Sequence, residues 1–300
     1  MQRSLSRRAF LIRSAAAAAA LHVPNLRAAS PPFANNKICA FEKPLVSLSY
    51  DALADLYAGL GLAGVEAAVR PGGHVLPERV EDDLPRMIES LKKRGLEMTI
   101  LTSAIDTLAA PHAEKVLRTA ARLGVRRYRM LWFNYDLKKP ILPQLEAIRP
   151  RLKELAALNR ELGLTALYQN HSGPKYVGSA LWDSYSLVRD FDPKEIGLAY
   201  DIHHATVEGG LNWPVQFNLV RSHIQAVYVK DFVWEDRKVK DVPLGRGKID
   251  PKFFTLLKES KYPGPISLHV EYMDHTSDPV QIGQAFGQDL ATLQSFLAKA

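Results

Sequence analysis

The 300-residue sequence contains a single cysteine, Cys39, which excludes an internal disulfide and a cluster of thiolate metal ligands. It also lacks a long apolar run. The longest N-terminal candidate, residues 15–23, is far shorter than the roughly 20 residues that cross a bilayer, so we expect no stable membrane anchor. With 47% hydrophobic residues, the chain has enough apolar material for one large domain or two small ones.

Acidic side chains are missing from the first 30 residues. In this segment basic residues precede an Ala-rich apolar stretch and then small residues, which is the layout of a signal peptide. The string "SRRAFL" matches the twin-arginine export pattern, so residues 1–30 are predicted to be a twin-arginine signal peptide. The protein is then periplasmic or secreted. A frayed amphipathic helix is the structural alternative.

Export changes the charge of the protein. The formal net charge of +7 falls by five, to about +2, when the five arginines of the leader are removed. The high charge is therefore largely a property of the leader, and no nucleic-acid partner is expected.

From residue 37 onward, eight apolar runs alternate with segments of helical periodicity. The runs have no polar face, as in parallel strands that are buried on both sides. Gly95, Gly124 and Gly163 follow helical segments and fit left-handed caps. The pattern predicts an α/β fold, a single-domain (β/α)8 TIM barrel over residues 37–300. A doubly wound open sheet is the alternative, but no Gly-rich phosphate fingerprint follows the first strand. The expected strands are 38–46, 64–69, 97–105, 125–133, 164–170, 196–205, 224–232 and 266–272.

The last four expected strands all finish in polar or ionisable residues. Because active sites of barrels lie at the C-terminal ends of the strands, we expect these side chains to line one mouth. They are Gln169 and His171 on strand five, Asp201, His203 and His204 on strand six, Tyr228, Lys230 and Asp231 on strand seven, and His269 and Glu271 on strand eight.

Asp201 and Glu271 are expected to converge on the barrel axis. Two carboxylates buried without partners are costly, and a divalent cation would neutralise both. Salt bridges to Lys230 or Arg70 would neutralise them without a metal. The sequence leaves these two explanations open.

The order of the strand-end motifs resembles the xylose isomerase-like barrels of the sugar phosphate isomerase/epimerase superfamily. The string "YDIHHA" is similar to Asp-x-x-His on strand six, "VYVKD" to His-x-Lys-Asp on strand seven, and "HVEY" carries the strand-eight glutamate. The resemblance covers nearly the whole chain after the leader. It implies a small-molecule carbohydrate substrate and one divalent metal ion, Mn²⁺, Mg²⁺, Co²⁺ or Zn²⁺.

The resemblance also implies residue roles. Asp201 and Glu271 match metal ligands, and His204 matches a histidine that contacts substrate. Gln169 stands where the strand-five glutamate usually is, and it would be a neutral, weaker ligand. Tyr228 stands where the strand-seven histidine usually is, so another histidine, His171, His203 or His269, would have to compensate.

Gln169 cannot act as a base, which disfavours a symmetrical two-base epimerisation. Glu271 remains as the single base, with Lys230 or a histidine such as His204 as the acid. The implied reaction is metal-assisted proton abstraction next to a carbonyl, as isomerisation or elimination on a free, keto or glycosidic sugar. Further candidate substrate contacts are Arg70, His74, His171, His269 and Trp132, although an ordinary turn and plain aromatic packing also explain some of them.

Two other functions compete with a sugar isomerase or lyase. An apurinic-site endonuclease on the same fold needs a three-metal cluster and a basic groove, and strand ends three and four offer little for either. A non-catalytic sugar-binding barrel that has lost the family metal site fits the changes at positions 169 and 228. The sequence leaves open whether the chain forms a homo-oligomer.

Export can be tested at the paired arginines. Changing Arg7 and Arg8 to lysine should trap the precursor in the cytoplasm, because the twin-arginine route reads this pair. Cell fractionation and immunoblotting would measure the distribution. Normal periplasmic accumulation of the double variant would contradict the prediction.

Overall fold

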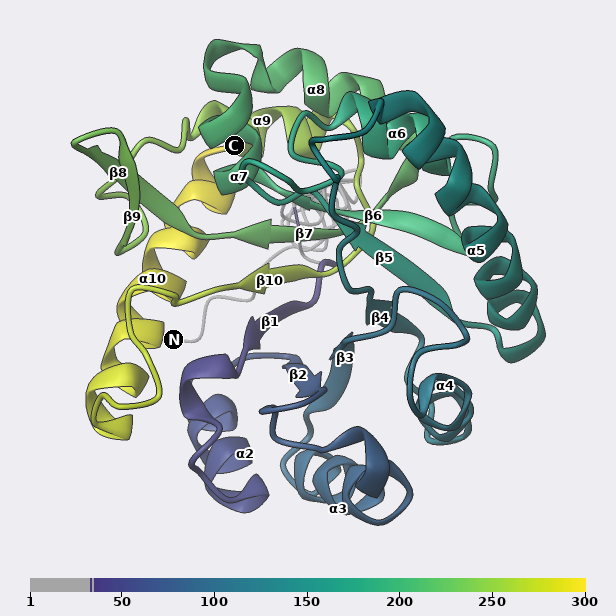
Figure 1. Cartoon of the computed structure of the whole chain (residues 1–300). Helices are drawn as coiled ribbons and strands as arrows, with labels where there is room; N and C mark the ends of the chain where they lie inside the picture. The colour runs from purple at the N-terminus through teal and green to yellow at the C-terminus, as the bar shows by residue number, and fades with distance from the viewer. Residues whose placement is uncertain (1–32, 34) are drawn as a thin grey trace, which may run out of the picture. The chain divides into compact units, whose positions relative to one another are not determined.

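The structure, a computed structural model, describes residue 33 and residues 35–300; the expected leader lies outside this part. Eight parallel strands close into a barrel in the order β1-β10-β7-β6-β5-β4-β3-β2, which confirms the predicted TIM barrel (Figure 1). The barrel strands are β1 (Ile38–Phe41), β2 (Gly64–Val69), β3 (Glu97–Ser103), β4 (Arg127–Arg129), β5 (Thr165–Gln169), β6 (Ile196–Asp201), β7 (Ile224–Val229) and β10 (Ile266–Leu268).

Helices surround the barrel (Figure 1). The glycines expected to cap three of them have φ of 72° at Gly95, 92° at Gly124 and 65° at Gly163, so each adopts the left-handed conformation that ends a helix. The helices are α2 (Tyr50–Gly59), α3 (Val80–Lys92), α4 (Ala113–Arg122), α5 (Ile141–Leu162), α6 (Trp182–Val188), α7 (Ile202–Gly209), α8 (Trp213–Val220), α9 (Lys252–Glu259) and α10 (Pro279–Lys299). Within residues 35–300, no helix has the length and apolar character needed to cross a membrane.

The core explains why the strands lack a polar face. Every residue of β2 and β6 is buried, because their side chains point alternately into the barrel and toward the helices. A large apolar cluster lies between strands and helices, and a small one inside the barrel includes Cys39, Ile100 and Leu167. The lone cysteine is thus a buried packing residue.

The sixth expected strand was too long. It ends at Asp201, and α7 begins at the next residue. The Asp201 Oδ1 accepts a hydrogen bond from the His204 backbone N–H at 3.2 Å, which caps the helix. His203 and His204 therefore lie on the first turn of a helix and not at the end of a strand.

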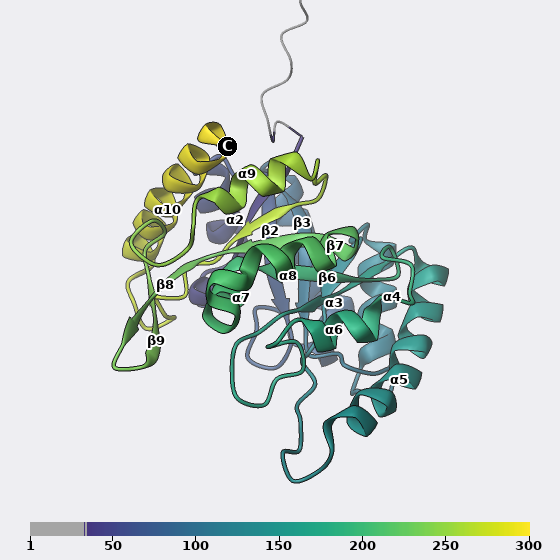
Figure 2. The same ribbon diagram turned by 90° about the horizontal axis from the view of Figure 1, so that it is seen from above.

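A two-stranded antiparallel hairpin at the barrel mouth was not predicted. It consists of β8 (Asp231–Glu235) and β9 (Lys238–Val242) and leaves the barrel directly after β7. Figures 1 and 2 show it extending outward from the end of that strand. Val239 and Asp241 of the hairpin line the cavity described below.

Asp231 holds the base of this hairpin. Its buried carboxylate accepts backbone hydrogen bonds from Gly245 (2.9 Å), Gly247 (3.0 Å) and Ile249 (3.1 Å), and from Phe232 (2.9 Å). A Cβ on Gly247 would lie 2.2 Å from the Asp231 Oδ1, so only glycine allows this approach. The carboxylate thereby fixes the following loop against the hairpin.

Replacement of Asp231 by alanine should lower the free energy of unfolding by about 3–5 kcal/mol, because four backbone N–H groups, two of them buried, lose a charged acceptor. Urea denaturation would measure the change, with Asp82→Ala, at an exposed site on α3, as the matched control. A loss below about 1 kcal/mol would show that the loop is held by other contacts.

Candidate active site at the barrel mouth

The carboxyl ends of the strands enclose a cavity of about 260 Å³. The barrel closure brings most of the predicted site residues to its wall. Those that line the cavity are Arg70, Trp132, Gln169, His171, His204, Lys230, His269 and Glu271. Asp201 is fully buried behind this wall, and His74 lies outside it.

Lys230 is the centre of an ion-pair network. Its ammonium forms an ion pair with the Glu271 carboxylate and lies 3.7 Å from the Asp201 Oδ2. Lys43, which was not predicted, approaches the other oxygen of Glu271 at 3.1 Å. The two carboxylates thus converge as expected, with an ammonium between them. Lys230 and Arg70 were the two residues expected to form salt bridges with these carboxylates in the absence of a metal. Lys230 does so, whereas Arg70 forms no salt bridge with a described residue.

The ion pairs set the charge states of this network. Burial alone would raise the pKa of Glu271, but the charges of Lys230, His269 and Lys43 outweigh burial and lower it well below its usual range. Burial opposes the charged form of Lys230 as well, and the carboxylates of Glu271 and Asp201 raise the pKa of this lysine above its ordinary value. A carboxylate and an ammonium therefore face the cavity at neutral pH.

Gln169 is oriented by a neighbour on β4. The Arg129 Nη1 donates to its Oε1 at 3.0 Å, and the Gln169 Nε2 donates to the Asp201 Oδ2 at 2.9 Å. The amide presents its N–H group and not its oxygen to Asp201. This geometry brings Gln169 to the predicted place but gives no support to its predicted role as a metal ligand.

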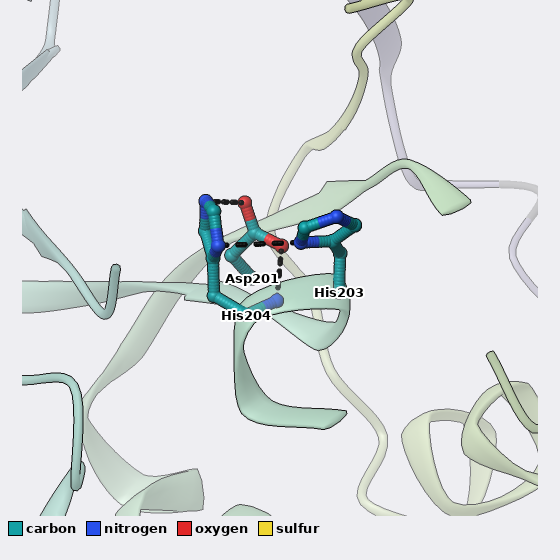
Figure 3. Close-up of side chains that lie close together, drawn as sticks. All are labelled: Asp201, His203 and His204. Carbon is teal, nitrogen blue, oxygen red and sulfur yellow. Dashed lines mark hydrogen bonds and ion pairs between the residues drawn. The ribbon is translucent and has the colours of Figure 1, made fainter. Parts of the chain in front are cut away.

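A different set of donors could hold a metal ion. Candidate ligand atoms of Asp201, His203 and His204 lie within 4.8 Å of one another. Figure 3 shows the three side chains side by side. The two Nδ1 atoms of the histidines are 3.2 Å apart, and the His204 Nε2 is 3.5 Å from the Asp201 Oδ2. All three side chains are buried. Of the predicted ligands Asp201, Glu271 and Gln169, only Asp201 belongs to this set, and His203 is one of the three histidines that were expected to compensate.

The chemistry of this triad fits a divalent cation. Burial, followed by the charge of Lys230, lowers the pKa of His204 well below its usual range, so its ring is neutral and has a free lone pair. Its Nε2 is buried and has no hydrogen-bond partner among the described residues. Two imidazoles and one carboxylate are a donor set that suits Zn²⁺ and similar ions. The ammonium of Lys230 beside Asp201 opposes such an ion.

The remaining histidines have distinct environments. Burial, followed by the charge of Lys230, lowers the pKa of His171 to about 4, and its ring lies 4.0 Å from that of His204. The His269 Nε2 lies 3.0 Å from the Oε2 of Glu66 on β2. Burial would raise the pKa of Glu66, but His269 and two hydroxyl donors lower it to about 2.

Sequence reasoning missed Glu66. The residue is fully buried and also accepts hydrogen bonds from Thr102 and Ser267, each at 2.6 Å. The available signal was a single acid inside the apolar run "GVEAAV". A carboxylate in such a run must have buried partners, and here the partners come from two other strands.

His74 was predicted to contact substrate, but the structure places it elsewhere. Its Nε2 lies 2.6 Å from the Leu48 carbonyl oxygen and its Nδ1 lies 3.3 Å from the Glu42 carboxylate. Burial disfavours the charged ring, and these two acceptors outweigh burial and raise the pKa of His74. The residue connects two segments of the fold beside the mouth. Trp132, in contrast, lines the cavity and contacts His171, with ring centroids 4.5 Å apart.

Comparisons with known proteins agree with this architecture. A family model described as "Xylose isomerase-like TIM barrel" matches residues 54–295. No match is found among the curated proteins.

Several solved structures share the fold. The 3-keto-D-glucoside 4-epimerase of E. coli has a TM-score of 0.67 and 16% identity, with 87% of this chain and 99% of that chain covered. The probable 3-DHS dehydratase of Bacillus anthracis has a TM-score of 0.68 and 16% identity, with 86% and 98% covered. The IOLI protein with a zinc atom has a TM-score of 0.69 and 18% identity, with 88% and 98% covered.

The triad gives a direct test of metal binding. Asp201→Asn and His203→Gln should each lower the affinity for Zn²⁺ and Mn²⁺ at least tenfold, about 1.4 kcal/mol, because each removes one of three donors. Titration calorimetry would measure the affinities, with His275→Gln, at an exposed site, as the control. In Gln169→Glu a second carboxylate beside that of Asp201 should raise the affinity for the cation. Undiminished binding in Asp201→Asn would place the metal elsewhere.

Proposed function

The chain belongs to the xylose isomerase-like TIM barrel family, and on that premise we propose that it is an enzyme that moves a proton next to a carbonyl group of a carbohydrate. The observation that carries the proposal is the pairing of Glu271 with Lys230 at the wall of the cavity. An ionised base and a fixed ammonium side by side are what abstraction of such a proton requires.

Glu271 is the proposed base. Its carboxylate is ionised at neutral pH, lines the cavity and keeps 17% of its side chain exposed. It lies at the end of β10, where a bound substrate has access to it. The residue at the end of β5, Gln169, has no proton-accepting group of comparable basicity. One base favours isomerisation or elimination over a symmetrical epimerisation.

Lys230 and His204 are the proposed partners of this base. Lys230 is only 5% exposed and is held in its charged form, so it can stabilise negative charge that develops on the substrate oxygen. The His204 Nδ1 lies 2.8 Å from the Ser172 hydroxyl. This contact leaves the other ring nitrogen directed toward Asp201 and orients the histidine at the wall of the cavity.

Asp201, His203 and His204 would hold a divalent metal ion. A bound ion would polarise the carbonyl oxygen of the substrate as a Lewis acid. The hairpin contributes to this site, because the Asp241 Oδ1 lies 3.0 Å from the His203 Nε2 and limits how that ring can turn. The solved IOLI protein carries a zinc atom, which supports the proposal by analogy of fold.

A non-catalytic sugar-binding barrel is the second candidate. It is favoured by one observation: Lys230 pairs with both Asp201 and Glu271, and Lys43 pairs with Glu271, so two ammonium groups balance the two carboxylates. Stoichiometric metal in the purified protein, together with turnover, would exclude it.

The proposed enzyme is also exported, directed by residues 1–30. Its proposed substrate is a free, keto or glycosidic sugar.

Glu271→Gln should abolish the proton transfer. We expect the rate of solvent deuterium incorporation next to the carbonyl of ketoses and 3-keto-glucosides to fall well over tenfold, a barrier increase above ~1.4 kcal/mol. Nuclear magnetic resonance in D₂O would measure the exchange. Glu259→Gln, the same change at an exposed site on α9, should leave the rate unaltered. Exchange at the normal rate in Glu271→Gln would remove this residue from the chemistry.

A further inference from the structure

The cavity contains more positive charge than its ion pairs use. Four basic side chains line it, namely Lys43, Arg70, Arg129 and Lys230. Both lysines are paired with Glu271. Within residues 35–300, neither arginine has a carboxylate oxygen within 4.0 Å, the limit for a salt bridge. Two cations at the wall of the site therefore lack an anionic partner in the described part of the chain.

Arg129 is the more unusual of the two. Its side chain belongs to β4 and is only 3% exposed, yet its one side-chain hydrogen bond to a described residue is the neutral contact to Gln169. The Nε atom is buried with no hydrogen-bond partner in the described part of the chain. The guanidinium lies over the Trp132 ring, 4.7 Å from its centroid, which fixes its plane at the cavity. A buried guanidinium without a counter-charge is costly, which indicates that a ligand supplies one.

Arg70 follows β2 directly and is half-buried. Burial lowers its pKa, and the like charge of Arg129, which lines the same cavity, lowers it further. Its guanidinium lies over the Phe41 ring at 5.7 Å. Glu66, Glu42 and Glu271 attract it only from beyond salt-bridge distance. An anion bound between the two arginines would relieve the repulsion.

The barrel closure puts these arginines across the mouth from the proposed chemistry. The barrel order is β1-β10-β7-β6-β5-β4-β3-β2, so strand β3 lies opposite β7. The two neighbours of β3 are β2 and β4. Arg70 and Arg129 thus flank the strand that faces Lys230. Strand β4 is itself opposite β10, which leads to Glu271. One wall of the mouth carries the base and its ammonium, and the opposite wall carries two guanidiniums that form no salt bridge with a described residue.

We propose that Arg70 and Arg129 form an anion subsite and that the substrate is a carbohydrate with a carboxylate or phosphate group. The guanidiniums bind the anionic oxygens, for which their planar fork of N–H donors is suited. The rest of the sugar extends across the cavity and brings its carbonyl to Glu271 and Lys230. The inference rests on the proposed function for the position of the reacting carbon, but the anion subsite is defined by the arginines alone.

Matched sugars test the subsite. Titration calorimetry on the full chain would compare D-glucose with D-glucuronate and D-glucose 6-phosphate, and D-galactose with D-galacturonate. We expect at least one anionic sugar to bind about tenfold or more tightly than its neutral counterpart. Whether the uronates or the sugar phosphate bind more tightly identifies the anion. The preference should disappear in Arg70→Met and Arg129→Met and persist in Arg122→Met, at an exposed site on α4.

Two further variants keep the outcome unambiguous. Arg129→Lys retains the charge if Arg129→Met fails to fold, and it should lose part of the preference because an ammonium cannot make the same paired contacts. Glu271→Gln should keep the anion preference while it loses proton exchange. Equal binding of neutral and anionic sugars, an unchanged preference in the arginine variants, or no binding of any anionic sugar would each overturn the proposal.

The two proposals fail separately. Proton exchange on neutral ketoses with no preference for anions would leave the proposed function intact and remove the subsite. Arginine-dependent binding of anionic sugars without any proton exchange would keep the subsite and remove the proposed function.

Discussion

The ion pairs of Lys230 with Glu271 and Asp201 are the interaction on which the site depends. They join the ends of three adjacent strands, β6, β7 and β10, at one point of the mouth. Burying the two carboxylates is costly, and the Lys230 ammonium between them offsets part of this cost, as they offset the cost of burying the ammonium. Gln169 adds a hydrogen bond to Asp201, and Lys43 adds a second cation to Glu271. The base proposed for catalysis is therefore held ionised by the same contacts that hold it in place.

Asp201 also caps helix α7 at the junction of β6 and α7. One of its oxygens caps the helix, and the other faces Gln169 and Lys230. Because the helix starts at once, His203 and His204 are carried on its first turn beside the carboxylate (Figure 3). A candidate metal site thus arises from a helix cap. Its donors and the Lys230 ammonium compete for the same carboxylate, which makes charge balance the property that decides what the mouth binds.

Charge is also divided across the mouth. Asp201, Lys230 and Glu271 occupy the side formed by β6, β7 and β10, and Lys43 follows the neighbouring strand β1. Arg70 and Arg129, which form no salt bridge with a described residue, occupy the side formed by β2 and β4, where the one buried carboxylate of β2, Glu66, is already bound to His269. The closed barrel maintains this separation, since its strands cannot change neighbours. A substrate that bridges both sides would be fixed at two ends, which is how a small cavity can orient a reacting carbon.

The sequence by itself determined the barrel, because strands buried on both faces and helices closed by glycine leave local signatures. It also located the polar strand ends, including Asp201, Lys230 and Glu271. Only the tertiary structure decided which of these groups pair. Arg129 orients Gln169 from a strand 40 residues earlier, and nothing in the local pattern of either segment records that contact. The closure of the barrel brings together residues that are this far apart in the sequence, and it thereby decides which charged groups pair.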